Sequence, residues 1–227
     1  MRRAILSAFT TVLILAFTAG CATAPVEPTN LSHIKAEIAE YIDSGRYMNQ
    51  IRKVSAAAIA WIERRTAAEA MSTAKQSSPA LTVVFDIDET LLSNLPHMRA
   101  MDFGYVPAAW DAWVARGEAP SIQPVMAVYQ RARLLGLDVI FITGRRERDR
   151  AGTERNLRAV GAGDYAMIFF RPDNTTGTSE RFKTATREHL ASDGRSIIAN
   201  IGDQESDLAG GFAERTFKLP DPFYLTK

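Results

Sequence analysis

The chain has 227 residues, of which 46% are hydrophobic and 23% are charged. A chain of this length can bury one substantial core with a small accessory element, so the sequence predicts one main domain. Basic and acidic side chains nearly balance, with a formal net charge of +1, which gives no indication of a nucleic acid polymer as a partner.

The first 20 residues have the layout of an export signal. Arg2 and Arg3 precede an apolar run over residues 4–19, and the small residue Gly20 follows. A charged start, a short apolar stretch and small residues before a cut site are typical of a secretory signal peptide. The run is close to the shortest that can span a membrane, so an uncleaved anchor is the alternative.

The only cysteine of the chain, Cys21, directly follows these small residues. The segment Thr18-Ala19-Gly20-Cys21 resembles the end of a bacterial lipoprotein signal, in which the cysteine becomes the lipid-bearing first residue of the mature protein. Residues 21–30, which include two prolines, would then form an extended tether. The resemblance implies an exported lipoprotein, anchored in a bacterial membrane such as the outer membrane and facing the periplasm or the cell surface.

Two helices are expected before the first strand, in an N-terminal extension that covers residues 31–78. Apolar residues recur at helical spacing over residues 31–42, and again from residue 47 to a stop near Ser77-Ser78-Pro79. We expect the apolar stripe of these helices to pack against the main domain, and a partner-binding role is the alternative.

Strands and helices alternate in the main domain, residues 79–227. The first strand, at 81–85, is a short apolar run rich in β-branched and aromatic residues, which is typical of a strand buried on both faces of a parallel sheet. The alternation implies right-handed βαβ crossovers, so we expect an α/β fold with a parallel sheet flanked by helices. The later strands are expected at 138–142, 165–170, 196–201 and near Phe217, with helices at 125–135, about 148–160 and 179–190.

An irregular stretch at about residues 95–120 follows the first strand and contains several prolines, glycines and aromatic residues. Its position in the chain predicts a small cap over a site at the end of that strand. Aromatic side chains pack well wherever surface is buried, so we expect them in the core of the cap, with a platform for a flat ligand as the alternative.

Acidic residues follow two of the predicted strands. Asp86 and Asp88 come directly after the first strand, and Asp203 and Asp207 come after the strand at 196–201, at the edge where open α/β sheets place their ligands. A lone D-x-D is equally consistent with a solvated turn. Four converging carboxylates are not explained by a solvated turn. Each like-charge pair about 4 Å apart costs on the order of 4 kcal/mol at an effective dielectric near 20. A divalent cation would relieve this repulsion, and oxygen-only ligands favour Mg²⁺ over zinc.

Two further signatures indicate a site for an anion. The strand at 138–142 is followed by Thr143 and Gly144, a hydroxyl and then a glycine that permits close backbone approach. Lys183 is the only lysine between residues 75 and 218, although a single helix lysine is also an ordinary surface residue. A cation, a lysine, a hydroxyl and loop amides near one carboxylate predict a cradle for a phosphoryl group.

Together these signatures match a known set of motifs. D-x-D-x-T after the first strand, a threonine after the second motif strand, a later lysine and G-D-x-x-x-D after the last resemble the four motifs of the haloacid dehalogenase-like (HAD) superfamily. Within it, the segments FDIDETLLSN, FITGR, NIGDQESDL and RTFKLPDPFY are similar to acid phosphatases that include plant vegetative storage proteins and bacterial class C lipoprotein phosphatases.

This resemblance implies a Rossmann-like domain with a small helical cap, and it implies a role for each motif residue. Asp86 would attack phosphorus to give an aspartyl-phosphate, and Asp88 would protonate the leaving alcohol and then activate water. The ligands of Mg²⁺ would be the Asp86 carboxylate, the Asp88 backbone carbonyl and Asp203, with Asp207 supporting them from outside the coordination sphere. The phosphoryl oxygens would be bound by Thr143, the Gly144 amide and Lys183.

Other chemistries remain as alternatives to an acid phosphatase. Dehalogenases and phosphonatases belong to the same superfamily, but a carbon–halogen bond has no leaving oxygen for Asp88 to protonate. A phosphotransferase on the same site fits the same residues, whereas a non-catalytic storage or binding lipoprotein would be favoured had Asp86 been replaced. Because stacking tolerates almost any flat group, nucleotides, sugar phosphates and aryl phosphates all remain candidate substrates.

Overall fold

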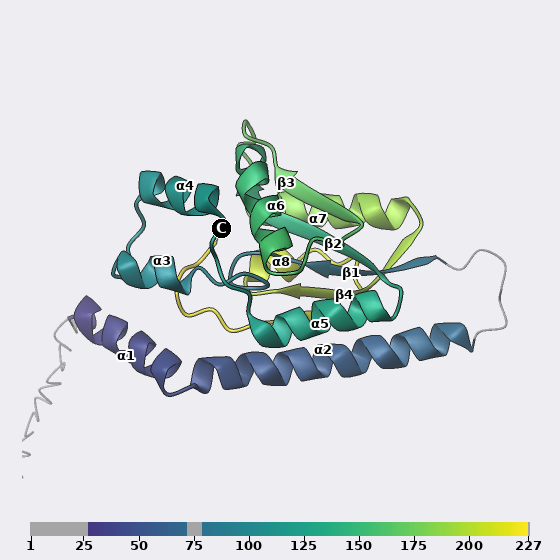
Figure 1. The fold of residues 1–227 in the computed structure, drawn as a ribbon, viewed down its shortest axis with the longest axis horizontal. Helices are drawn as coiled ribbons and strands as arrows, with labels where there is room; N and C mark the ends of the chain where they lie inside the picture. The colour runs from purple at the N-terminus through teal and green to yellow at the C-terminus, as the bar shows by residue number, and fades with distance from the viewer. Residues whose placement is uncertain (1–26, 72–78, 227) are drawn as a thin grey trace, which may run out of the picture.

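A computed structural model describes residues 27–71 and 79–226. Its centre is a five-stranded sheet in the order β3-β2-β1-β4-β5, and every neighbouring pair is parallel. The expected α/β fold with a parallel sheet is therefore confirmed (Figure 1). The strands are β1 (Ala80–Phe85), β2 (Asp138–Arg146), β3 (Met167–Arg171), β4 (Arg195–Gly202) and β5 (Thr216–Lys218).

Helices cover both faces of the sheet, as right-handed crossovers on either side of β1 require. On one face α2 packs against α5, and on the other α7 packs against α8. The helices are α1 (Leu31–Asp43), α2 (Arg46–Ala70), α3 (Leu95–Ala100), α4 (Pro107–Arg116), α5 (Gln123–Leu134), α6 (Arg150–Ala159), α7 (Ser179–Ser192) and α8 (Glu205–Leu208), with a 3-10 turn η1 at Glu147–Asp149.

The core is divided by the sheet, because successive residues of a strand point to opposite faces. Val83 and Phe85 of β1 are fully buried in the larger cluster, which includes residues of α2 and α5. Val84, between them, belongs to a second cluster with Ile140 and with Leu190 of α7. This burial on both faces explains why the sequence of β1 is an uninterrupted apolar run.

The long helix α2 is fixed to the main domain along its apolar stripe. Ile51 and Ile62 are fully buried, and the indole Nε1 of Trp61 donates a hydrogen bond to the Ile198 carbonyl of β4 at 2.7 Å. The helix ends at Ala70, and the stop expected near residues 77–79 falls mostly on residues outside the described part of the chain.

Helix α1 differs from α2, because none of its residues is buried. It contacts the cap through two ion pairs, Lys35 with Asp102 and Asp43 with Arg99, each with 2.5 Å between nitrogen and oxygen. Both pairs are largely exposed, so each contributes about 0–1 kcal/mol to stability.

The cap consists of α3 and α4, which lie beside the carboxyl ends of the strands (Figure 1). Helix α4 approaches α6 so closely that a Cβ added at Gly152 would lie 2.3 Å from the carbonyl oxygen of Val114. Only glycine fits at residue 152, and the cap is therefore seated directly on the main domain.

Two local features differ from the pattern expected from sequence. β2 does not end at residue 142 but continues to Arg146, with an irregular register between Thr143 and Arg146. Thr143 and Gly144 thus lie on the irregular end of a strand rather than in the loop after it. The short helix α8 was not expected at all.

Within residues 27–71 and 79–226, no helix is both long and apolar enough to cross a membrane. The predicted signal over residues 1–20 and the predicted lipidation site Cys21 lie outside the described residues.

Candidate active site

The aspartate cluster lies at the point where the strand order reverses. From β1 the chain winds outward through β2 and β3, and then returns to form β4 on the other side of β1. Asp86 follows β1 and donates its backbone N–H to the Ile201 carbonyl of β4 at 2.9 Å, and Asp203 follows β4. Such a switch point, at the carboxyl ends of the strands, is where open α/β sheets bind their ligands.

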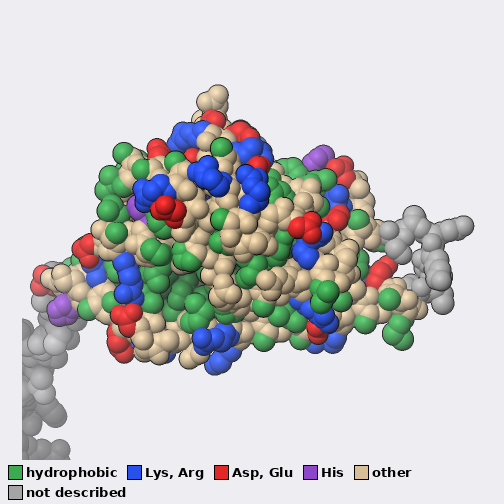
Figure 2. All heavy atoms as spheres, viewed as in Figure 1, with side chains coloured by type: hydrophobic (Ala, Val, Ile, Leu, Met, Phe, Trp, Pro, Cys, Tyr) green, Lys and Arg blue, Asp and Glu red, His purple; other side chains and the backbone are tan. Residues whose placement is uncertain are grey.

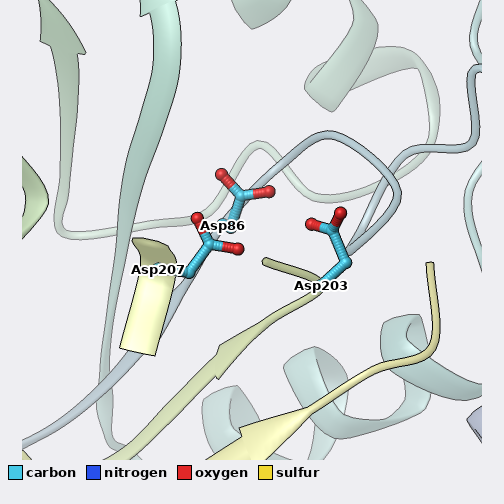
Figure 3. Close-up of side chains that lie close together, drawn as sticks. All are labelled: Asp86, Asp203 and Asp207. Carbon is cyan, nitrogen blue, oxygen red and sulfur yellow. The ribbon is translucent and has the colours of Figure 1, made fainter. Parts of the chain in front are cut away.

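Three carboxylates meet there. Asp86, Asp203 and Asp207 are all buried, and each offers an oxygen such that the three atoms lie within 4.8 Å of one another. Figure 3 shows them entering the site from three segments, the end of β1, the loop after β4 and α8. Of the four carboxylates predicted to converge here, the structure therefore brings three together, and Asp88 is not part of this group.

The motif G-D-x-x-x-D has a steric basis at its first residue. A Cβ added at Gly202 would lie 2.4 Å from the Cβ of Asp207, so any larger residue would displace that side chain. Asp207 Oδ2 also accepts a hydrogen bond from the Gln204 backbone N–H at 2.8 Å, which fixes the loop that carries Asp203.

Lys183 extends from α7 into this cluster. Its buried ammonium bonds to an oxygen of Asp86, and to Asp207 Oδ1 at 2.6 Å. Burial opposes the charge of Lys183, but the two carboxylates outweigh it and raise its pKa. For Asp86 the balance is the opposite, because burial together with the charges of Asp207 and Asp88 outweighs Lys183 and raises its pKa to about 7.

The side chain of Asp88 turns away from this cluster and binds Arg145. Nη2 of Arg145 lies 2.7 Å from Asp88 Oδ1, and the side-chain amide of Asn94 donates to the same oxygen at 2.8 Å. Burial alone would raise the pKa of Asp88, but the Arg145 guanidinium and these hydrogen bonds hold the pKa below its usual value. The surroundings thus raise the pKa of Asp86 and lower the pKa of Asp88, although the two residues are only two positions apart.

The donor set fits a hard divalent cation. Five buried or nearly buried carboxylates gather here, and the ion pairs among them are those of Lys183 with Asp86 and Asp207 and of Arg145 with Asp88. Burial and the neighbouring carboxylates raise the pKa of Asp203 as well, so the cluster is short of positive charge. All available ligand atoms are oxygens, which is the preference of Mg²⁺. The five carboxylates are those of Asp86, Asp88, Glu89, Asp203 and Asp207.

Two of the three predicted anion-binding residues line the cavity beside Asp86, and the third does not. Gly144 and Lys183 line the cavity of about 680 Å³ into which Asp86 and Asp88 open. Thr143 is fully buried and does not line it, and its hydroxyl accepts a hydrogen bond from the Arg145 backbone N–H at 3.1 Å.

Aromatic side chains from two distant segments form the outer wall of the cavity. Trp113 of the cap is buried and stacks on His97, as expected for a core residue, but the other cap aromatics face the cavity together with the C-terminal segment. Figure 2 shows hydrophobic side chains in a recess on the left of the molecule, above α1 and α2. The aromatic residues that line the cavity are Phe103, Tyr105, Trp110, Phe223 and Tyr224.

Sequence reasoning missed four residues of the site: Glu89, Asn94, Arg145 and Tyr224. Glu89 is buried at a left-handed φ of 51°, and its carboxylate accepts hydrogen bonds from Asn94 and from the hydroxyl of Tyr224 at 3.2 Å. Burial and the nearby Asp88 raise the pKa of Glu89 to about 8. The sequence did point to two of these residues, because Glu89 directly follows Asp88 and Arg145 directly follows Gly144.

The fold and the site together define a capped α/β domain with a buried aspartate cluster at its switch point. The family model described as HAD superfamily, subfamily IIIB (Acid phosphatase), matches residues 10–227, and the chain belongs to this family. The resemblance read from the four motifs is thereby confirmed.

Similar proteins come from plants and bacteria. The chain is 38% identical over 153 residues to the stem 28 kDa glycoprotein of Glycine max, a match that covers 64% of this chain and 60% of that protein. It is 38% identical over 146 residues to acid phosphatase 1 of Solanum lycopersicum, covering 62% and 57%. The chain thus spans about three fifths of the length of these relatives. The solved class C acid phosphatase of Bacillus anthracis shares the fold, with a TM-score of 0.63, 21% identity and coverage of 85% of this chain and 86% of that one.

Proposed function

We propose that this protein is a phosphatase that hydrolyses phosphomonoesters through an aspartyl-phosphate on Asp86. The observation that carries the proposal is the placement of Asp86. It is buried at the end of β1, is held by Lys183, lies beside Asp203 and opens into the cavity. Membership of an acid phosphatase family supports the same chemistry.

In the first step an oxygen of Asp86 attacks phosphorus, and the ester P–O bond breaks as the new P–O bond forms. Asp88, on the other side of the same loop, gives a proton to the leaving oxygen, and it must first take that proton up from acidic solution because the Arg145 guanidinium favours its charged form. In the second step Asp88 takes a proton from water, the water oxygen attacks phosphorus, and inorganic phosphate leaves with Asp86 regenerated. Each residue returns to its starting state, so the cycle balances.

The remaining motif residues orient the phosphoryl group. Lys183 and the backbone amide of Gly144 would bind its oxygens, and the buried hydroxyl of Thr143 would support the irregular end of β2 through its hydrogen bond from the Arg145 backbone. Mg²⁺, held by Asp86, Asp203 and the Asp88 backbone carbonyl, would neutralise charge on the phosphoryl oxygens. Asp207 accepts hydrogen bonds from Lys183 and from the Gln204 backbone, and the resemblance to the family implies that it supports the ligands from outside the coordination sphere.

The substrate is a small phosphomonoester with a flat or compact leaving group. The cavity of about 680 Å³ exceeds what a phosphate alone needs, and its outer wall is aromatic. Nucleotides, sugar phosphates and aryl phosphates fit this description.

The test is a turnover screen of the purified full chain in detergent with Mg²⁺. We expect release of inorganic phosphate from at least one of the three substrate classes. A folded protein that releases phosphate from none of them would contradict the proposal.

Export as a lipoprotein is a separate part of the proposal, supported by the layout of residues 1–21. In a bacterial host, Cys21→Ser should abolish labelling by a radioactive fatty acid and release the protein from membranes. Unchanged membrane association of this variant would support an uncleaved anchor in place of a lipid.

A further inference from the structure

Arg145 has no role in the mechanism above, yet it makes the most extensive side-chain contacts to Asp88. Its side chain is 2% exposed at the irregular end of β2. Nε lies 3.1 Å from both carboxylate oxygens of Asp88, and Nη2 lies 2.7 Å from Oδ1. A guanidinium fork bound in this way fixes the plane of a carboxylate as well as its position.

Neighbouring residues hold the guanidinium itself. Nη1 of Arg145 donates to the hydroxyl of Thr153 at 3.0 Å, and that hydroxyl donates to the Asp149 carbonyl at 2.9 Å. The ring of Trp110, from the cap, lies 5.8 Å from the guanidinium carbon. Thr153 of α6 and Trp110 of α4 therefore hold the Arg145 guanidinium in place.

The two oxygens of Asp88 are not equivalent. Oδ1 accepts from Nη2 of Arg145 and from the Asn94 amide, in addition to the shared contact with Nε, whereas Oδ2 has only the shared contact. Asn94 is itself fully buried and accepts a hydrogen bond from the indole of Trp113 at 2.8 Å. Asp88 lines the cavity with 16% of its side chain exposed. Arg145 and Asn94 thus hold Oδ1 from several sides and leave Oδ2 with a single partner.

We propose that Arg145 is the positioning residue for Asp88: its guanidinium fork, itself held by Thr153 and Trp110, fixes the plane of the Asp88 carboxylate at the cavity. This inference rests on the proposed role of Asp88. Arg145 keeps its own protons throughout and acts only through Asp88.

A double-mutant cycle separates this role from direct substrate binding. Arg145→Met alone should lower kcat by roughly 10²- to 10⁴-fold, the usual contribution of acid–base catalysis, with little change in KM. In an Asp88→Asn background the same substitution should lower kcat by no more than about threefold, because the group that Arg145 orients is already disabled. The double variant also leaves no unpaired buried charge, so it remains testable if the single variant folds poorly.

A matched control uses Arg133, which forms a similar fork on the exposed Asp164, with Nε at 3.2 Å and Nη2 at 2.9 Å from Oδ2. Arg133→Met should leave both kcat and KM unchanged.

A full, multiplicative loss from Arg145→Met in the Asp88→Asn background, or a rise in KM of the same size in both backgrounds, would overturn the proposal and indicate contact with the substrate. Arg145→Lys should recover only part of the loss, because an ammonium cannot reproduce the fork. Full recovery with lysine would likewise count against the proposal.

Discussion

Asp86→Asn is expected to lower turnover at least roughly 10⁴-fold, since an amide oxygen is a poor nucleophile although it nearly preserves the shape of the carboxylate. Lys183 would keep its bond to Asp207, and the cluster would lose one of its excess negative charges. The variant should therefore be no less stable than the wild type. Phosphate release and thermal unfolding, measured on the same preparation, check both expectations.

A matched control for this substitution is Asp164→Asn, because the side chain of Asp164 is 79% exposed and remote from the cavity. It should retain full turnover. An Asp86→Asn enzyme that keeps turnover within about tenfold of the wild type would remove Asp86 from the role of nucleophile.

Exhaustive chelation is expected to abolish activity, and added Mg²⁺ to restore it. Asp203→Asn should weaken Mg²⁺ binding at least roughly 10- to 100-fold, measured by titration calorimetry, because it removes a charged ligand. In Asp203 the Thr90 hydroxyl donates to Oδ1 at 3.1 Å and the Gln204 amide donates to Oδ2 at 2.8 Å. With asparagine at residue 203, its amide oxygen can keep the bond from Gln204 while its NH2 group donates to the Thr90 hydroxyl, so the loop should keep its position. Unchanged Mg²⁺ affinity in the variant, or full activity after chelation, would disprove the metal assignment.

Much of the fold could be predicted because its signals are local. An apolar run such as β1 is buried on both faces, and helical periodicity located α2 and α5. The extension of β2 through Gly144 could not be predicted, since glycine after an apolar run is more typical of a turn. Helix α8 has only four residues, too few for a periodic pattern.

The site was predictable where its residues follow strands. The carboxyl ends of parallel strands share one edge, so Asp86 and Asp203 had to converge once the sheet was known. The partners of Arg145 and Tyr224, by contrast, could not be assigned from the sequence. Arg145 meets Asp88 across 57 positions, and Tyr224 reaches Glu89 across 135, and only the folded chain brings either pair together.

The covalent intermediate provides the most direct test of the account. With p-nitrophenyl phosphate, whose leaving group needs little protonation, Asp88→Asn should still complete the first step but lack the base for the second. The phosphoenzyme should therefore accumulate, and mass spectrometry after a rapid acid quench should find one phosphate on the peptide that contains Asp86. Phosphate on any other residue, or turnover by Asp88→Asn at the wild-type rate with no phosphoenzyme, would contradict the account.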